Sequence, residues 1–186
     1  MSAEGCPIQI FFPDCHIRRG CPVHDASATT HHGGIDDSAA QRRGPRPPEP
    51  YRAFLSVEKY LDGCGIPHAT IGFMKLRASQ INGCAFCVDM HNRELKKDGE
   101  SDERIWSVAA WRETTFYTPA ERAALALTEE ATRLADHGKG VSDEVWQEAA
   151  EHYDDKQLAS LVVAVAMINA WNRLAVTTRA VPGGGV

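Results

Sequence analysis

The chain has 186 residues and a formal net charge of −5 at pH 7, with 43% hydrophobic and 24% charged residues. This composition is typical of a globular protein, and the acidic balance argues against nucleic acid as a main partner, because nucleic acids bind basic surfaces. No apolar run approaches the roughly 20 residues of a membrane helix, and the first residues lack the basic and apolar regions of a signal peptide. We therefore expect a cytoplasmic protein without membrane contact. In that reducing compartment, six cysteines indicate redox chemistry, metal binding or packing rather than a disulfide framework.

Residues 1–49 differ in composition from the rest of the chain. They hold three of the six cysteines and end in the run RRGPRPPEP. Their periodic apolar surface is too small to offset the entropy cost of ordering, so we expect a disordered extension. The packed domain is expected over residues 50–186.

Within this extension, four residues approach the spacing of RNA-binding zinc fingers: Cys6, Cys15, Cys21 and His24. The histidine comes one residue early, and few aromatic or basic residues lie nearby to contact RNA. Adventitious metal binding by the Cys/His tract is a second interpretation. The interpretation we favour is an extension with no function of its own.

The rest of the chain has helical periodicity throughout, with no convincing strand, and the prediction is an all-α domain. The first helix begins near Tyr51 and stops at Gly63 or Gly65. The following helices are expected over about His68 to Ile81, Cys84 to Lys97, and Ser101 through Trp106 to Trp111.

The later helices have clear start signals. Thr118, Pro119 and Glu121 form the pattern of a capping box with proline at the first helical position. Ser142 caps the next helix, and Asp154 or Asp155 opens the last. That last helix is apolar nearly all round from Leu158 to Ala166, which predicts a central buried helix. The four tryptophans are expected to pack in the core: Trp106, Trp111, Trp146 and Trp171.

Cys84, Cys87 and His91 occur in the stretch RASQINGCAFCVDMH and share one face of the predicted helix. The thiols would lie in the first turn, where unpaired N–H groups and the helix dipole favour a thiolate. A thiolate that attacks a peroxide becomes a sulfenic acid, which a second thiol captures as a disulfide. A neighbouring imidazole can exchange the proton. The set therefore holds the groups that a minimal peroxidase or disulfide exchanger needs.

Zinc binding and passive packing are the alternatives for this motif. A structural zinc ion takes four ligands, usually with a second closely spaced pair, and no cysteine follows His91. A thioredoxin-like motif would normally lie in a βαβ setting, which is not predicted. Redox chemistry is the interpretation that we favour, with no metal and no cofactor on the chain.

The stretch LRASQINGCAFCVDMHNREL resembles the carboxymuconolactone decarboxylase superfamily, in its alkylhydroperoxidase AhpD-like branch. The short helix with Trp106 and Trp111, the TPAERAALALTE stretch and VAMINAWNRLA are also similar to this family. The resemblance covers about Tyr51 to Ala180. It implies a helical bundle that assembles as a trimer or hexamer and reduces hydroperoxides with electrons from a thiol or lipoyl-type donor.

The resemblance also implies roles for individual residues. Cys87 matches the cysteine that forms the sulfenic acid, Cys84 matches the proton donor and resolving thiol, and His91 matches the relay histidine. The family often has a relay glutamate twelve residues before the first cysteine, where this chain has Gly72. Glu94 and Glu129 are candidates to support the relay instead.

The expected activity is thus thiol-dependent hydroperoxide reduction. A general disulfide oxidoreductase is one alternative, and a protein that senses oxidants or binds zinc without turnover is another. Decarboxylation of a muconolactone is disfavoured, because the decarboxylases of the superfamily do not use the cysteine pair.

Overall fold

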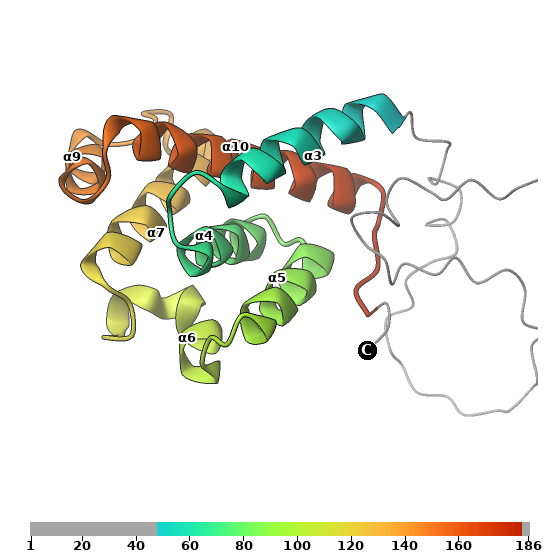
Figure 1. Cartoon of the computed structure of the whole chain (residues 1–186), viewed down its shortest axis with the longest axis horizontal. Helices are drawn as coiled ribbons and strands as arrows, with labels where there is room; N and C mark the ends of the chain where they lie inside the picture. Colours follow the sequence, from blue (N-terminus) through green and yellow to red (C-terminus); the bar gives the residue numbers. More distant parts are fainter. Residues whose placement is uncertain (1–47, 184–186) are drawn as a thin grey trace, which may run out of the picture.

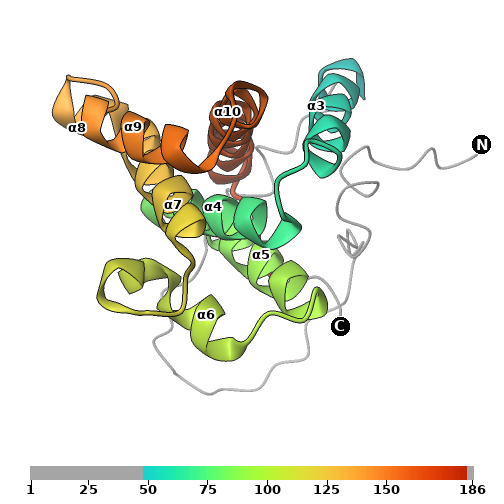
Figure 2. The same cartoon turned by 60° about the vertical axis from the view of Figure 1, so that its left-hand side comes forward.

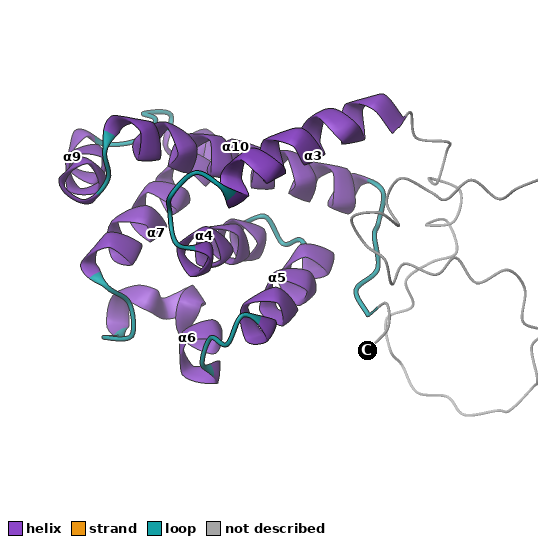
Figure 3. Ribbon diagram, in the orientation of Figure 1, coloured by secondary structure: helices purple, strands orange, loops and turns teal. Residues whose placement is uncertain are grey.

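The computed structural model describes residues 48–183, and the regular elements in this range are all helical (Figures 1 and 3). The all-α prediction is confirmed. The expectations for the N-terminal extension and its Cys/His tract fall outside the described residues, which begin at Pro48. In chain order the elements are α3 (Pro48–Asp62), α4 (His68–Ile81), α5 (Ala85–Lys97), α6 (Asp102–Ser107), the 3₁₀ helix η1 (Val108–Glu113), α7 (Pro119–Thr132), α8 (Leu134–His137), α9 (Asp143–His152) and α10 (Asp155–Thr177).

The predicted capping residues start the helices. The Thr118 hydroxyl accepts a hydrogen bond from the backbone N–H of Glu121, and the Glu121 carboxylate accepts one from the Thr118 N–H, which completes a capping box at α7. The side chains of Ser101, Ser142 and Asp154 cap α6, α9 and α10. These local hydrogen bonds satisfy N–H groups that the first turn of a helix leaves unpaired.

Two of the four tryptophan predictions are wrong. Trp111 and Trp171 are buried, but Trp106 is 75% exposed and Trp146 is 39% exposed. Helix α6 is a short element that buries Ile105, and its next residue points about 100° away from that face. Helical periodicity over so few residues does not determine which side faces the core.

Helix α4 occupies the centre of the fold. Figures 1 and 2 show α3 and α10 on one side of α4 and α5 and α6 on the other. Ile71 and Met74 pack into the core shared with α7, α9 and α10, whereas Phe73 and Leu76 pack into the core shared with α5, α6 and η1. Because α4 is held on both sides, its C-terminal end is a firm base for the segment that follows.

The prediction that the last helix is the central one is therefore wrong. Helix α10 buries Leu161, Ala164 and Val165, but Val162 is 44% exposed, and Ala159 and Ala166 are exposed as well. Residues 159, 162 and 166 follow helical spacing and form one apolar stripe on the surface. A helix that is apolar all round can thus still have a face that residues 48–183 leave uncovered.

Helix α10 is also long and apolar enough, by length and composition, to cross a membrane. No segment of this length and composition was expected from the sequence, and that expectation was wrong on this point. Core helices of soluble proteins pass the same test, and α10 packs against α3, α4, α7 and α9.

Candidate active site

The candidate site begins at the turn between α4 and α5. Helix α4 ends at the cap residue Asn82, and Gly83 follows with a φ of 66°. This left-handed conformation costs little for glycine, which has no Cβ, and it lets the chain reverse sharply. The next residue, Cys84, is the N-cap of α5.

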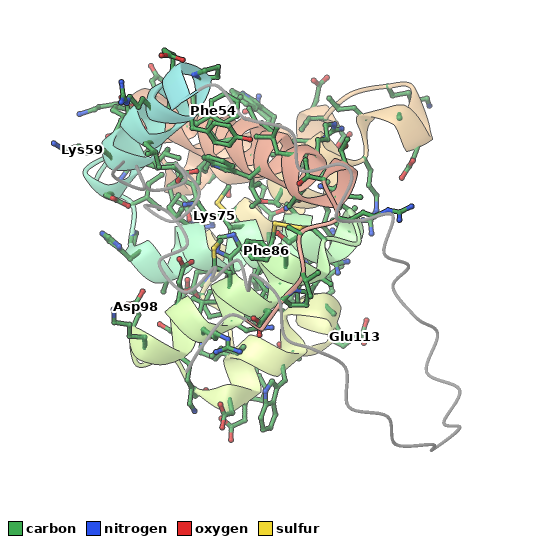
Figure 4. The ribbon with its side chains drawn as sticks, turned by 90° about the vertical axis from the view of Figure 1, so that its right-hand side faces the viewer. Phe54, Lys59, Lys75, Phe86, Asp98 and Glu113 are labelled. Carbon is green, nitrogen blue, oxygen red and sulfur yellow. A yellow bond between two sulfur atoms is a disulfide. The ribbon has the colours of Figure 1, made fainter. Side chains whose placement is uncertain are left out.

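Cys84 and Cys87 are joined by a disulfide, with their Cα atoms 5.4 Å apart. Both residues are buried, and Figure 4 shows the yellow disulfide beside Phe86. The Cys84 sulfur also accepts a hydrogen bond from the backbone N–H of Cys87 at 3.3 Å. The pair therefore lies at the N-terminus of α5, where N–H groups and the helix dipole stabilise negative charge on sulfur.

His91 lies one turn after Cys87 on the buried face of α5. Its Nδ1 is 2.7 Å from Oε2 of Glu94. A carboxylate can only accept, so Nδ1 carries the hydrogen, and a neutral ring then has its lone pair on Nε2. That Nε2 is buried and has no hydrogen-bond partner among the described residues. The imidazole is thus held in the tautomer that can take a proton.

Glu94 links this buried imidazole to the surface. The His91 side chain is 5% exposed, whereas the Glu94 side chain is 56% exposed. Burial would raise the pKa of Glu94, but its hydrogen bond with His91 and the charges of Lys75 and Lys97 lower it below its ordinary value. Glu94 is therefore a charged acceptor that can keep His91 in a fixed orientation.

A cleft of about 320 Å³ opens beside Glu94, between α3, α4 and α5. Its walls include Glu58, Lys75 and Leu95. Lys75 Nζ is 2.6 Å from Oε2 of Glu58, and the other oxygen of Glu58 accepts from Trp171 Nε1 at 2.8 Å. In Figure 4, Lys75 lies near the centre of the view and Asp98, another wall residue, lies at the edge.

Gly72, at the position of the family's relay glutamate, also lines this cleft. A Cβ atom added at Gly72 would lie 2.7 Å from Cδ2 of Leu95, whose side chain is fully buried. Real Cβ contacts are essentially never that short. Leu95 therefore fills the space in which a side chain at position 72 would begin.

Glu129 lies among arginines. Its Oε1 accepts from Arg77 Nε at 2.6 Å and from Trp111 Nε1 at 3.2 Å, and its Oε2 accepts from Arg112. Burial would raise the pKa of Glu129, but Arg112 and Arg77 lower it below its ordinary value. Within residues 48–183 these contacts occupy both carboxylate oxygens, and His91 is not among the partners. The structure brings Glu94 to the histidine and ties Glu129 into an ion-pair cluster.

The remaining cysteine of the described chain, Cys64, is a buried free thiol in the core. No group of three or more histidine, cysteine, aspartate or glutamate side chains within residues 48–183 is arranged to hold a metal ion. Glu58 and Lys75, which pair across two helices, were not among the residues predicted from sequence. Their separation of 17 residues follows no local pattern.

Comparison with known proteins assigns the chain to a family. The model of the carboxymuconolactone decarboxylase family matches residues 48–130. The chain is 42% identical to the uncharacterized protein YdfG of Bacillus subtilis (strain 168) over 129 residues, which is 69% of this chain and 86% of YdfG.

Solved structures agree with this assignment. A protein of unknown function from Agrobacterium tumefaciens, a candidate antioxidant defence protein AhpD, superposes with a TM-score of 0.69 at 37% identity, over 80% of this chain and 97% of that one. The debrominase Bmp8 with bound 2,3,4-tribromopyrrole superposes with a TM-score of 0.66 at 20% identity, over 73% and 72% of the two chains, which shows a shared fold only. The chain belongs to the carboxymuconolactone decarboxylase family and has an AhpD-like fold.

Proposed function

We propose that the protein reduces hydroperoxides with electrons from a thiol donor, through the Cys84–Cys87 pair. One observation carries this proposal: the joined sulfurs share the buried face of α5 with an imidazole whose Nε2 has no hydrogen-bond partner within the described part of the chain. The similarity to the AhpD-like protein of Agrobacterium tumefaciens supports it. Structural zinc would need further ligands near the two sulfurs.

In the proposed cycle, the Cys87 thiolate attacks the distal oxygen of the hydroperoxide. The O–O bond breaks, Cys87 becomes a sulfenic acid, and the alkoxide takes a proton and leaves as an alcohol. The Cys84 thiolate then attacks the Cys87 sulfur, and hydroxide leaves as water after protonation. Two thiols of the donor reduce the disulfide and are themselves oxidised.

His91 serves the proton transfers in this cycle. Its hydrogen bond to Glu94 leaves Nε2 free to take the thiol proton and to return it to the leaving oxygen. Glu94 is a positioning residue, which acts through His91 by accepting the hydrogen bond from Nδ1. It takes the part that the glutamate at position 72 plays in the family, while Glu129 has a structural part.

We also propose a homo-oligomer, a trimer or hexamer as in the family. The apolar stripe of Ala159, Val162 and Ala166 on α10 supports burial against further copies of the chain. A thiol or lipoyl-type donor fits a protein of the reducing cytoplasm, where we place it.

The test is to treat the reduced full chain with one equivalent of an alkyl hydroperoxide and to measure its mass with peptide mapping. We expect rapid loss of two hydrogen atoms, mapped to Cys84–Cys87, and turnover once a dithiol is supplied. Cys87→Ser should abolish peroxide consumption. Cys84→Ser should leave a sulfenic acid on Cys87.

Other results would point elsewhere. Rapid exchange with disulfides but no reaction with peroxide would support a general disulfide oxidoreductase. Oxidation without turnover by any thiol donor would support an oxidant sensor, and a retained zinc ion would support metal binding. Normal turnover in Cys87→Ser would mean that the nucleophile is wrongly assigned.

A further inference from the structure

A buried polar network lies behind the turn that precedes Cys84. Asn82 Nδ2 donates to Oδ1 of Asn172 at 2.8 Å and to Oδ1 of Asn169 at 3.1 Å. Asn172 Nδ2 donates to the hydroxyl of Ser79 at 3.0 Å. Asn172 and Ser79 are 1% and 0% exposed. Side-chain amides of α10 are thus bonded to the end of α4 and to its cap residue.

If its only role were to hold two helices together, such a network would have a higher free-energy cost than apolar packing. A buried amide is costly unless its hydrogen bonds are made, and apolar side chains would pack α4 against α10 equally well. Hydrogen bonds differ from apolar contacts in that they fix distance and direction. The network therefore fixes where the turn lies relative to α10 more closely than packing would.

The position of this turn decides the surroundings of one sulfur. Only Gly83 separates Asn82 from Cys84, and the Cys84 N–H donates to the Ser79 carbonyl at 3.0 Å. The Cys84 side chain is thereby placed to accept from the Cys87 N–H at 3.3 Å. After reduction, that N–H would donate to the Cys84 thiolate, and hydrogen bonds to charged groups are the strong ones.

We propose that Asn82 and Asn172 are positioning residues that set the redox equilibrium of the Cys84–Cys87 pair, by holding Cys84 at the first turn of α5. The proposal rests on the proposed function in that the pair must cycle between disulfide and dithiol. Stabilisation of a thiolate favours the reduced form, so a well-placed Cys84 makes the disulfide easier to reduce. Reduction takes two electrons, which two thiols of the donor supply as they form their own disulfide.

The test compares Asn172→Leu and Asn82→Ala with the parent full chain. Each protein is equilibrated with glutathione at several ratios of thiol to disulfide, then alkylated and mapped. We expect both variants to shift the equilibrium toward the Cys84–Cys87 disulfide by about tenfold, the size of one hydrogen bond to a charged group. The pH midpoint for alkylation of Cys84 should rise in both.

Ser160→Ala is the matched control. Ser160 is a fully buried hydroxyl on α10 that bonds to Tyr60 and to the Lys156 carbonyl, away from the turn. Ser160→Ala should lower thermal stability without changing the glutathione equilibrium or the pH midpoint for alkylation of Cys84. Asn82 is only partly buried, so Asn82→Ala decides the question should Asn172→Leu not fold.

An unchanged equilibrium and pH midpoint in folded variants of lower stability would overturn the proposal, because the network would then act on the fold alone. Failure of the proposed function looks different. The parent pair would equilibrate with glutathione but would not be oxidised by a hydroperoxide.

Discussion

Leu95 occupies the space into which a side chain at position 72 would extend, with its Cδ2 2.7 Å from the place of a Cβ on Gly72. The residue before it, Glu94, hydrogen-bonds to His91. The carboxylate of the proposed relay is therefore supplied from α5 rather than from α4. Gly72, where the sequence resemblance predicts a glutamate, and the bulky Leu95 are in this way two parts of one local arrangement.

Gly72→Glu should destabilise the protein. From the sequence alone, restoring the family glutamate would be expected to raise the rate, but the new side chain would first displace Leu95, and overpacking a core typically costs about 1–3 kcal/mol. Thermal unfolding measures this loss. Leu95→Ala should cost less stability in the Gly72→Glu variant than in the parent, and an equal cost in both would show that Leu95 is not the obstacle.

Glu94→Gln should lower the rate of peroxide reduction by about tenfold or more, because a hydrogen bond to a charged group is lost. Stopped-flow oxidation of the reduced pair measures this rate. Because the pKa of Glu94 is lowered, its carboxylate stays charged at pH values at which an ordinary glutamate is protonated. The hydrogen bond of the charged carboxylate with His91 should therefore be lost only when the pH falls through that lowered pKa. Glu103→Gln changes an exposed carboxylate of α6 that does not line the cleft, and this control should react at the parent rate.

Glu129→Gln should reduce stability by about 1–3 kcal/mol, because the largely buried Arg77 loses its counter-charge, whereas Arg112 is 51% exposed and can be solvated. The pKa of Glu129 lies below its ordinary 4.5 in the folded chain, so its contribution is complete above that value and is lost as the pH falls through the folded pKa. Unfolding midpoints across this pH range check both statements. If Glu129→Gln were as stable as the parent but reduced peroxide much more slowly, the result would support a role for Glu129 in the proton relay.

Val162→Glu should reduce the proposed homo-oligomer to smaller species, because it places a charge in the apolar stripe of α10. Light scattering after size-exclusion chromatography measures the mass. Trp146→Glu makes a similar change at an exposed apolar residue of α9 and should leave the mass unaltered. Equal masses for all three proteins would place the contact between copies elsewhere.

Local signals made much of the fold predictable. Capping residues such as Thr118 and Asp154 satisfy N–H groups within their own first turn, so their pattern lies in a few consecutive residues. The grouping of Cys84, Cys87 and His91 on one helix face followed from spacing for the same reason. Glu94 could be named as a candidate because it lies three residues after His91.

The remaining features depend on contacts between distant segments. The bonds from Asn82 to Asn172 join residues 90 positions apart, and the contact of Leu95 with position 72 depends on how α4 packs on α5. Trp106 was misassigned because a short helix carries too few residues to define its buried side. The packing between helices determines these contacts and the buried side of a short helix. Helical periodicity alone does not predict that packing.

The groups proposed to handle electrons and protons all lie in one continuous stretch, from Cys84 to Glu94. The cleft beside Glu94, at the far end of this stretch, takes its other walls from α3, α4 and the loop between them, through residues such as Leu61, Ile66 and Ile71. Substitutions in these walls would therefore change the shape of the cleft while the stretch proposed to react stays intact. A fold divided in this way can vary its cleft without rebuilding its proposed reactive centre.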